Sequence, residues 1–102
     1  MDEMEQVVIN LIVNSGSARS SAIEAIQYAK AGDMDKAAES LQQAKESVNE
    51  AHHAQTEMIQ AEIRGERAPL NLLMVHAQDH LMTSLVVIDL AQEFIDVYKK
   101  IG

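Results

Sequence analysis

The sequence predicts an all-α protein, an antiparallel up-down-up bundle of three helices, on three observations. Ala, Leu, Gln, Glu and Met dominate, while aromatic residues make up 3% of the chain and there is one proline. Apolar positions recur at helical spacing in three long stretches, which two short breaks separate. A length of 102 residues and a hydrophobic content of 47% fit a single domain over residues 1–102.

The first helix is expected over residues 3–31. Its apolar positions, such as Leu11 and Ala22, keep helical spacing until the break at Ala31-Gly32-Asp33. The middle of this helix reads Asn14-Ser15-Gly16-Ser17-Ala18. These residues lower the helix propensity but let another backbone approach closely, so we expect either a contact site or a bend there.

The second helix is expected over residues 34–64. Gly32 suits a C-terminal cap of the preceding helix and Asp33 an N-cap of this one, so the two helices are antiparallel neighbours. One apolar face runs from Met34 to Ile63, about eight turns.

The third helix is expected over residues 70–100, after a short connection at 64–69. Pro69 fits its first turn, and Lys99 and Lys100 suit the negative end of its dipole. Apolar residues point in nearly all directions over its N-terminal two-thirds, whereas a monomer's surface helix has one apolar stripe. We therefore expect a homo-oligomer built around this helix.

Charge and composition narrow the function classes. The net charge of -8 makes nucleic acid and anionic membrane surfaces unfavourable partners. The absence of Cys removes disulfides, thiolate metal sites and a Cys nucleophile. The acidic start Met1-Asp2-Glu3 is unlike a signal peptide, and the longest apolar run is too short to span a membrane, so we expect a cytoplasmic protein.

The chemistry-bearing residues are concentrated in the third helix, where His76, Asp79 and His80 interrupt an apolar run. Asp79 falls on a stripe with Leu72, Val75, Met82 and Val86, which makes it the residue of the three expected to be most buried. If copies of this helix meet on an axis, the carboxylates converge and must take up protons or bind a hard cation such as Mg²⁺ or Ca²⁺. A polar residue that only fixes the register is an equally weighted alternative.

His76 and His80 at i and i+4 suit two different chemistries. Zinc catalysis of the zincin type is disfavoured because Ala77 stands where a Glu is required and no third ligand is evident. His76 as the nucleophile toward a phosphoryl group fits better, with Gln78 and His80 as accessory hydrogen-bond donors. Periodicity alone also allows two histidines half-buried at an interface. His52, His53 and Gln55 in the second helix receive no role.

The sequence resembles the IIA component of the bacterial phosphoenolpyruvate-dependent sugar phosphotransferase system, lactose/cellobiose type. The resemblance covers nearly the whole chain and rests on three segments. These are Asn14-Ser15-Gly16-Ser17-Ala18-Arg19-Ser20, then Asn49-Glu50-Ala51-His52 with Gln55-Thr56, and most specifically Val75-His76-Ala77-Gln78-Asp79-His80-Leu81-Met82-Thr83.

The resemblance implies a homotrimer of three-helix bundles. It implies that His76 accepts phosphate on Nε2 from the phosphohistidine of HPr, as a tele-phosphohistidine, and passes it to a cysteine of the IIB component. It also implies that three copies of Asp79 share a divalent cation on the trimer axis, and it leaves His80 as an accessory residue.

The leading hypothesis is therefore a cytoplasmic phosphoryl carrier that serves uptake of a β-linked disaccharide. In this system the membrane IIC component selects the sugar, so lactose, cellobiose and chitobiose stay open, with a cellobiose-like diglucoside preferred. The alternative is a non-enzymatic helical oligomer whose His and Asp residues fix the assembly or hold a structural metal.

Overall fold

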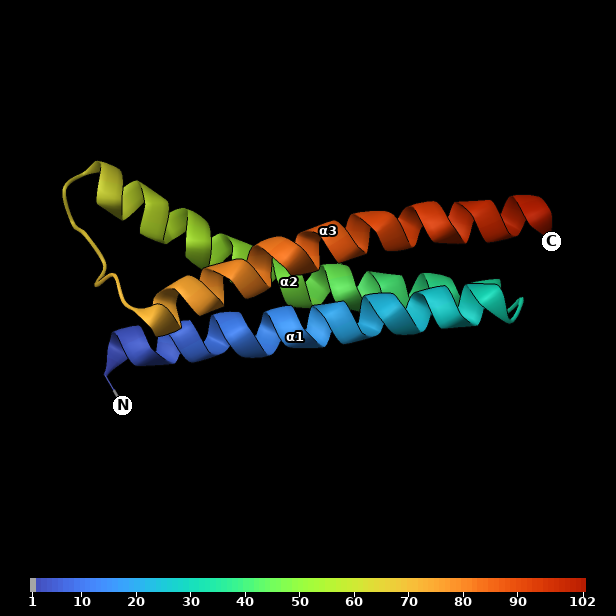
Figure 1. The fold of residues 1–102 in the computed structure, drawn as a ribbon, viewed down its shortest axis with the longest axis horizontal. Coiled ribbons are helices and arrows are strands. Elements are labelled where there is room, and N and C mark those ends of the chain that lie inside the picture. Colours follow the sequence, from blue (N-terminus) through green and yellow to red (C-terminus); the bar gives the residue numbers. More distant parts are fainter. Residues whose placement is uncertain (1) are drawn as a thin grey trace.

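Three long helices make up most of the chain in the computed structural model, which describes residues 2–102. They are α1 (Glu3–Lys30), α2 (Met34–Ile63) and α3 (Leu72–Ile101). α1 and α3 run parallel and α2 runs antiparallel to both, in an elongated bundle of 52 × 25 × 19 Å (Figure 1). The predicted all-α, up-down-up three-helix fold is confirmed.

Each helix begins at a residue whose side chain accepts a hydrogen bond from a backbone amide in the first turn. Asp2 accepts from the amide of Glu5 at 2.8 Å, and Asp33 accepts from the amide of Lys36 at 3.1 Å. These caps satisfy donors that have no partner within the helix. α1 and α2 begin at the predicted residues and end one residue before the predicted limits.

The prediction that α3 begins at residue 70, with Pro69 in its first turn, is wrong. Asn71 is the N-cap, because its side chain accepts from the amide of Met74 at 2.8 Å, and the helix begins at Leu72 and ends at Ile101. An Asn side chain offers the first turn a hydrogen bond that proline cannot. Pro69 consequently lies in the connection between α2 and α3, which is longer than expected.

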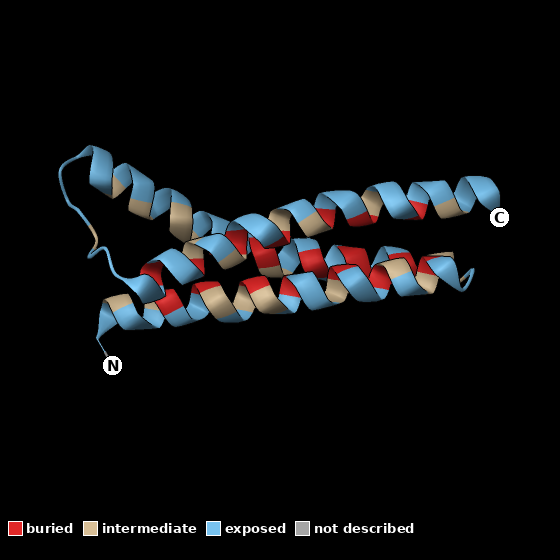
Figure 2. Ribbon diagram, in the orientation of Figure 1, coloured by how far each residue is buried: buried red, intermediate tan, exposed pale blue. Residues whose placement is uncertain are grey.

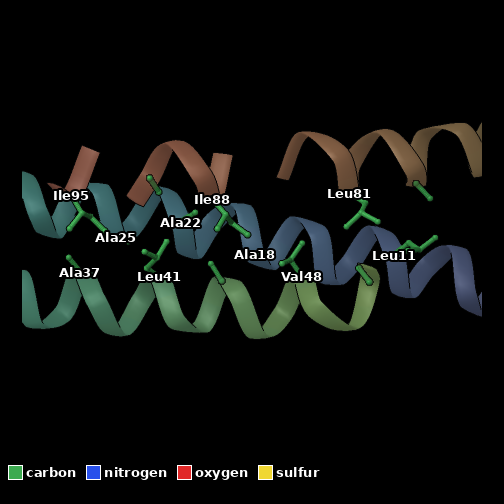
Figure 3. Packing of buried hydrophobic residues seen from close by; sticks show 14 of the residues in the cluster. Leu11, Ala18, Ala22, Ala25, Ala37, Leu41, Val48, Leu81, Ile88 and Ile95 are labelled. Carbon is green, nitrogen blue, oxygen red and sulfur yellow. The ribbon is translucent and has the colours of Figure 1, made fainter. Parts of the chain in front are cut away.

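Small side chains dominate the core. Four alanines of α1 are buried at the centre of the bundle, which lets the other helices pack closely against α1. Leu11 and Leu81 are the largest side chains that are fully buried, one from α1 and one from α3 (Figure 3). The buried alanines are Ala18, Ala22, Ala25 and Ala29 of α1, Ala37, Ala44 and Ala51 of α2, and Ala77 and Ala91 of α3.

The second half of α2 departs from the bundle. Ala51 is its last buried residue, and the helix then leads away from α3 toward the α2–α3 connection (Figures 1 and 2). Ile59 and Ile63 are exposed, so the apolar face predicted for all of α2 is buried only as far as Ala51, with Ala54 and Met58 partly buried beyond it. The bundle is therefore closed at one end and open at the other, where α2 diverges although Val8, Leu11 and Met74 of α1 and α3 remain buried in the core.

The small residues in the middle of α1 form a contact and not a bend. α1 continues through residues 14–18, and Ser15 is fully buried against α3. The hydroxyl of Ser84 lies 2.8 Å from the backbone carbonyl of Ser15 and links the two helices. None of the helices within residues 2–102 is long and apolar enough to cross a membrane.

Replacing Leu81 by Ala tests the packing of α3 against α1. Because Leu81 is fully buried, Leu81→Ala should lower the free energy of unfolding by about 2–5 kcal/mol, as measured by urea denaturation at one fixed protein concentration. The matched control is Val13→Ala, at a position of α1 that is 59% exposed, where the change should stay within about 0.5 kcal/mol. Equal effects of the two variants would contradict this packing.

Candidate functional site

The packing of α3 fixes which of its polar residues face outward. Met74, Ala77, Leu81 and Ser84 are buried against the other helices. Because successive residues in a helix are separated by about 100°, the side chains between them point to the flanks or to the outer surface.

His76 and His80 lie together on the flank of α3 that faces α1. Their rings are in edge-to-face contact, with centroids 4.5 Å apart and an angle of 86° between the ring planes. His76 is exposed and His80 is half-buried. This pair leaves one imidazole open to a partner and a second in contact with it, which suits a nucleophile with a neighbouring hydrogen-bonding group.

The backbone around His80 is tied to α1. The hydroxyl of Ser84 lies 2.6 Å from the carbonyl oxygen of His80 and 2.8 Å from that of Ser15, so it contacts both helices at once. The side chain of His80 borders a groove that is also lined by Gly16 and Arg19 of α1. The position of the histidine pair therefore depends on the α1–α3 contact.

Asp79 is exposed, so the prediction that it is the most buried of the three polar residues is wrong for a single chain. The stripe predicted around it does exist, but it points away from the bundle. Its apolar members are exposed by 48–85%, and they continue to the end of α3 and not only over its N-terminal two-thirds. They are Leu72, Val75, Met82, Val86, Leu90, Phe94, Val97 and Ile101, and with Asp79 we call them the outer stripe.

A single chain does not supply a metal centre. Within residues 2–102, no group of three or more His, Asp or Glu side chains is arranged to hold an ion. Asp79 provides one exposed carboxylate, which is a hard oxygen donor. The donor set fits a divalent cation only where the carboxylates of several copies converge.

Gln78 lies on the other flank of α3, about 200° around the helix from His76, so one chain does not bring the two together. Its side-chain oxygen accepts a hydrogen bond from Nε2 of Gln55 in α2 at 2.8 Å. Its own Nε2 lies 3.8 Å from the sulfur of Met58 and 3.6 Å from that of Met74. Gln78 is thus held against α2 and cannot assist His76 of the same chain from this position.

Gln55, for which the sequence predicts no role, holds Gln78 in place. It is half-buried just beyond the last buried residue of α2, where it pairs with Gln78. Its position in the helical pattern allowed contact with α3, but its partner becomes visible only in the folded chain. His52 and His53 are exposed, and Nε2 of His53 lies 3.3 Å from Glu57 on the same helix.

Comparisons with known proteins agree on one family. The family model described as "PTS system, Lactose/Cellobiose specific IIA subunit" matches residues 6–99. The chain is similar to the lichenan-specific phosphotransferase enzyme IIA component of Bacillus subtilis, with 52% identity over 98% of this chain and 91% of that one.

Solved structures give the same result. The crystal structure of the cellobiose-specific enzyme IIA from Bacillus anthracis matches with a TM-score of 0.94 and 55% identity, over 99% of this chain and 93% of that one. A solution structure of the IIA(Chitobiose)–HPr complex from Escherichia coli contains a chain that matches with a TM-score of 0.83 and 40% identity, over 99% of this chain and 98% of that one.

A double-mutant cycle on Gln55 and Gln78 tests the contact between α2 and α3. From urea denaturation of Gln55→Ala, Gln78→Ala and the double variant, the coupling energy should be about 0.5–1.5 kcal/mol, because the hydrogen bond is partly buried. The control cycle uses Gln92 and Asp96, whose bond of 3.0 Å is exposed within one helix and should couple by about 0.2–0.5 kcal/mol. Zero coupling between Gln55 and Gln78 would show that the two amides do not stabilise the open end.

Proposed function

The chain belongs to the lactose/cellobiose-specific IIA family of the sugar phosphotransferase system, and we propose that it carries a phosphoryl group on His76 between two protein partners. The observation that supports this most directly is the exposed imidazole of His76 in contact with the half-buried ring of His80. A carrier needs a nucleophile that two partners can reach in turn. A buried histidine would not serve.

The proposed donor is the phosphohistidine of HPr, in line with the HPr complex known for the similar chitobiose protein. The lone pair of Nε2 of His76 attacks phosphorus, and the bond between phosphorus and the donor nitrogen breaks as the new P–N bond forms. The electron pair returns to the donor imidazole, which takes up a proton while His76 gives up the one on Nδ1. The second transfer moves the phosphoryl group to a cysteine thiolate of the IIB component, and His76 regains its proton.

His80 is proposed as the accessory residue of the same chain. Its ring is in contact with His76, so an N–H of His80 can donate to a phosphoryl oxygen with little movement of the side chain. For phosphoryl transfer between two imidazoles, the protein has to supply mainly in-line positioning of the two rings and stabilisation of the phosphoryl charge. Holding the group in one orientation is then the main contribution of His80.

The outer stripe supports the proposal of a homotrimer. A row of large apolar side chains along a whole helix is typically covered by another subunit. If three outer stripes pack around an axis, the three Asp79 carboxylates converge and share a cation such as Mg²⁺, which would neutralise their charge. In the same arrangement the Gln78 flank of one subunit faces the His76 flank of the next, so Gln78 would assist a neighbouring subunit.

The proposed pathway is uptake and phosphorylation of a β-linked disaccharide of the cellobiose, chitobiose or lactose class. The similar proteins are specific for lichenan, cellobiose and chitobiose systems. The membrane IIC component would select the sugar, and this chain would act in the cytoplasm and meet the membrane only through its partners.

A non-enzymatic helical oligomer with a structural metal site is the second candidate, because the outer stripe and Asp79 are also what such a protein requires. Phosphorylation separates the two candidates. Only a carrier gains the mass of one phosphoryl group in an acid-labile form.

Labelling with phosphoenolpyruvate, enzyme I and HPr tests the nucleophile. His76→Ala should lose all protein-bound label, because it removes the attacking nitrogen, whereas His80→Ala should keep its label but acquire it about 10- to 100-fold more slowly, as expected for the loss of one hydrogen bond to a charged group. The control is His53→Ala, an exposed histidine of α2, which should label at the wild-type rate. Label that survives in His76→Ala would move the nucleophile to another residue.

Asp79→Leu tests the shared cation and the assembly together. Elemental analysis of the purified protein should show metal in the wild type and none in Asp79→Leu. Sedimentation should give trimers of both, because leucine continues the outer stripe and removes a buried charge. Asp89→Leu is the control, since Asp89 is an exposed carboxylate of α3 that is not a member of the outer stripe. Equal metal content in the wild type and Asp79→Leu would exclude Asp79 as the ligand.

A further inference from the structure

A groove beside the histidine pair is lined by a basic side chain, Arg19, that has no role in the fold or in the site described above. The groove runs along α1, and its lining includes Gly16, Arg19 and Ser20 together with His80 of α3. Arg19 is exposed, and no carboxylate within residues 2–102 lies within 4.0 Å of its guanidinium. Glu24 borders the same groove but does not pair with Arg19.

Arg19 is also isolated from the other basic residues. The chain has eight Lys and Arg residues and a net charge of -8, so most charged side chains on its surface are acidic. An unpaired guanidinium beside the histidines stands out against this background. Two of the other seven lie in the α2–α3 connection, four lie in the helix turns at the opposite end of the bundle, and Lys45 lies on α2 and does not line this groove. These are Arg64 and Arg67, and Lys30, Lys36, Lys45, Lys99 and Lys100.

Gly16 leaves space at the base of the groove because it has no side chain. A glycine in the middle of a helix costs stability relative to alanine, so it usually has a packing or conformational reason. Neither reason holds within the chain. Gly16 has no positive φ, and a Cβ atom at this position would meet nothing within 4 Å. The space that this glycine leaves borders both Arg19 and His80.

We infer that Arg19 is a phosphoryl-binding residue, whose guanidinium pairs with oxygens of the group carried on His76 in the space left open by Gly16. This inference rests on the proposed function and extends it. A phosphoryl group brings negative charge into an acidic protein, and an Arg donates to phosphoryl oxygens through two parallel N–H groups. No other Lys or Arg of residues 2–102 lines this groove.

The rate of phosphoryl transfer tests Arg19. In single-turnover transfer from phospho-HPr, Arg19→Gln should lower the rate constant at saturating donor roughly 10- to 100-fold, which is typical of losing one charged hydrogen-bonding partner. Arg19→Lys should recover part of the loss because it keeps the charge but not the paired donors. Lys30→Gln, which removes the same charge at an exposed position in the last turn of α1, should transfer at the wild-type rate.

A second measurement separates phosphoryl binding from partner docking. His76 is phosphorylated chemically with phosphoramidate, and the loss of phosphate in buffer is followed without any partner protein. Arg19→Gln should change this rate at least several-fold relative to the wild type and Lys30→Gln. If the rate is unchanged and only the half-saturating concentration of phospho-HPr rises, Arg19 contacts the partner and the inference is overturned.

Gly16→Ala tests the space at the base of the groove. It should raise the melting temperature, because the new methyl group meets no atom of the chain and the helix propensity improves, yet it should slow transfer several-fold. Ser17→Ala is the control at the adjacent exposed position of α1 and should transfer normally. Loss of the trimer in Gly16→Ala would assign the glycine to subunit packing and overturn its part in the inference.

The outcomes distinguish this inference from the proposed function. If the wild-type protein takes no label on His76, both the proposed function and the inference about Arg19 are wrong. A wild type that labels on His76, together with Arg19→Gln and Gly16→Ala variants that transfer at the wild-type rate, would remove the inference alone.

Discussion

The packing of α3 against the alanine-rich face of α1 is the interaction on which the rest of the molecule depends. It sets the rotation of α3 about its own axis, because Ala77 and Leu81 are buried and can face only the bundle. With about 100° between successive residues, that rotation directs Asp79 outward and the two histidines to the flank beside α1. The site is therefore a consequence of the core, and no loop is needed to build it.

The two ends of the bundle serve different purposes. At the closed end, small side chains such as Ala25 and Ala37 pack with larger ones such as Leu41 and Ile95 and exclude water. At the open end, beyond Ala51, α2 and α3 are joined by the amides of Gln55 and Gln78 and by nearby methionine sulfurs. Methionine side chains adapt to irregular space. This end thus keeps α2 attached without a close-packed core, next to the helix that carries the histidines.

Two buried serines, Ser15 and Ser84, lie at the contact between α1 and α3 next to His80. The single hydroxyl hydrogen of Ser84 is close to the carbonyl oxygens of both Ser15 and His80, while the hydroxyl of Ser15 has no partner although it is fully buried. Alanine at these positions would avoid the desolvation cost of the hydroxyl groups. For Ser84 that cost is offset, because its hydroxyl holds the turn that carries His80 against α1.

The sequence predicted the features that follow from local chemistry, and it could not predict those that depend on distant contacts. Helical spacing, together with the Asp33 cap of α2, predicted α1 and α2 to within one residue, whereas Pro69 misplaced the start of α3 because the Asn71 cap becomes evident only from its geometry. Asp79 was correctly assigned to an apolar stripe, but periodicity does not say whether a stripe faces the core or another subunit. The pairing of Gln55 with Gln78 joins residues 23 positions apart and has no local signature.

The location of His76 also constrains how a labile group can be carried. A phosphoramidate sealed in the core would be protected from water but unreachable by a partner, and one on a flexible loop would be reachable but poorly oriented. An exposed ring on a helix, with a second ring in edge-to-face contact, would avoid both problems because the helical backbone positions the ring and the ring is open to solvent. In the proposed function, successive partners would need only to recognise the flank between α1 and α3, and the carrier would not have to rearrange between receiving the phosphoryl group and giving it up.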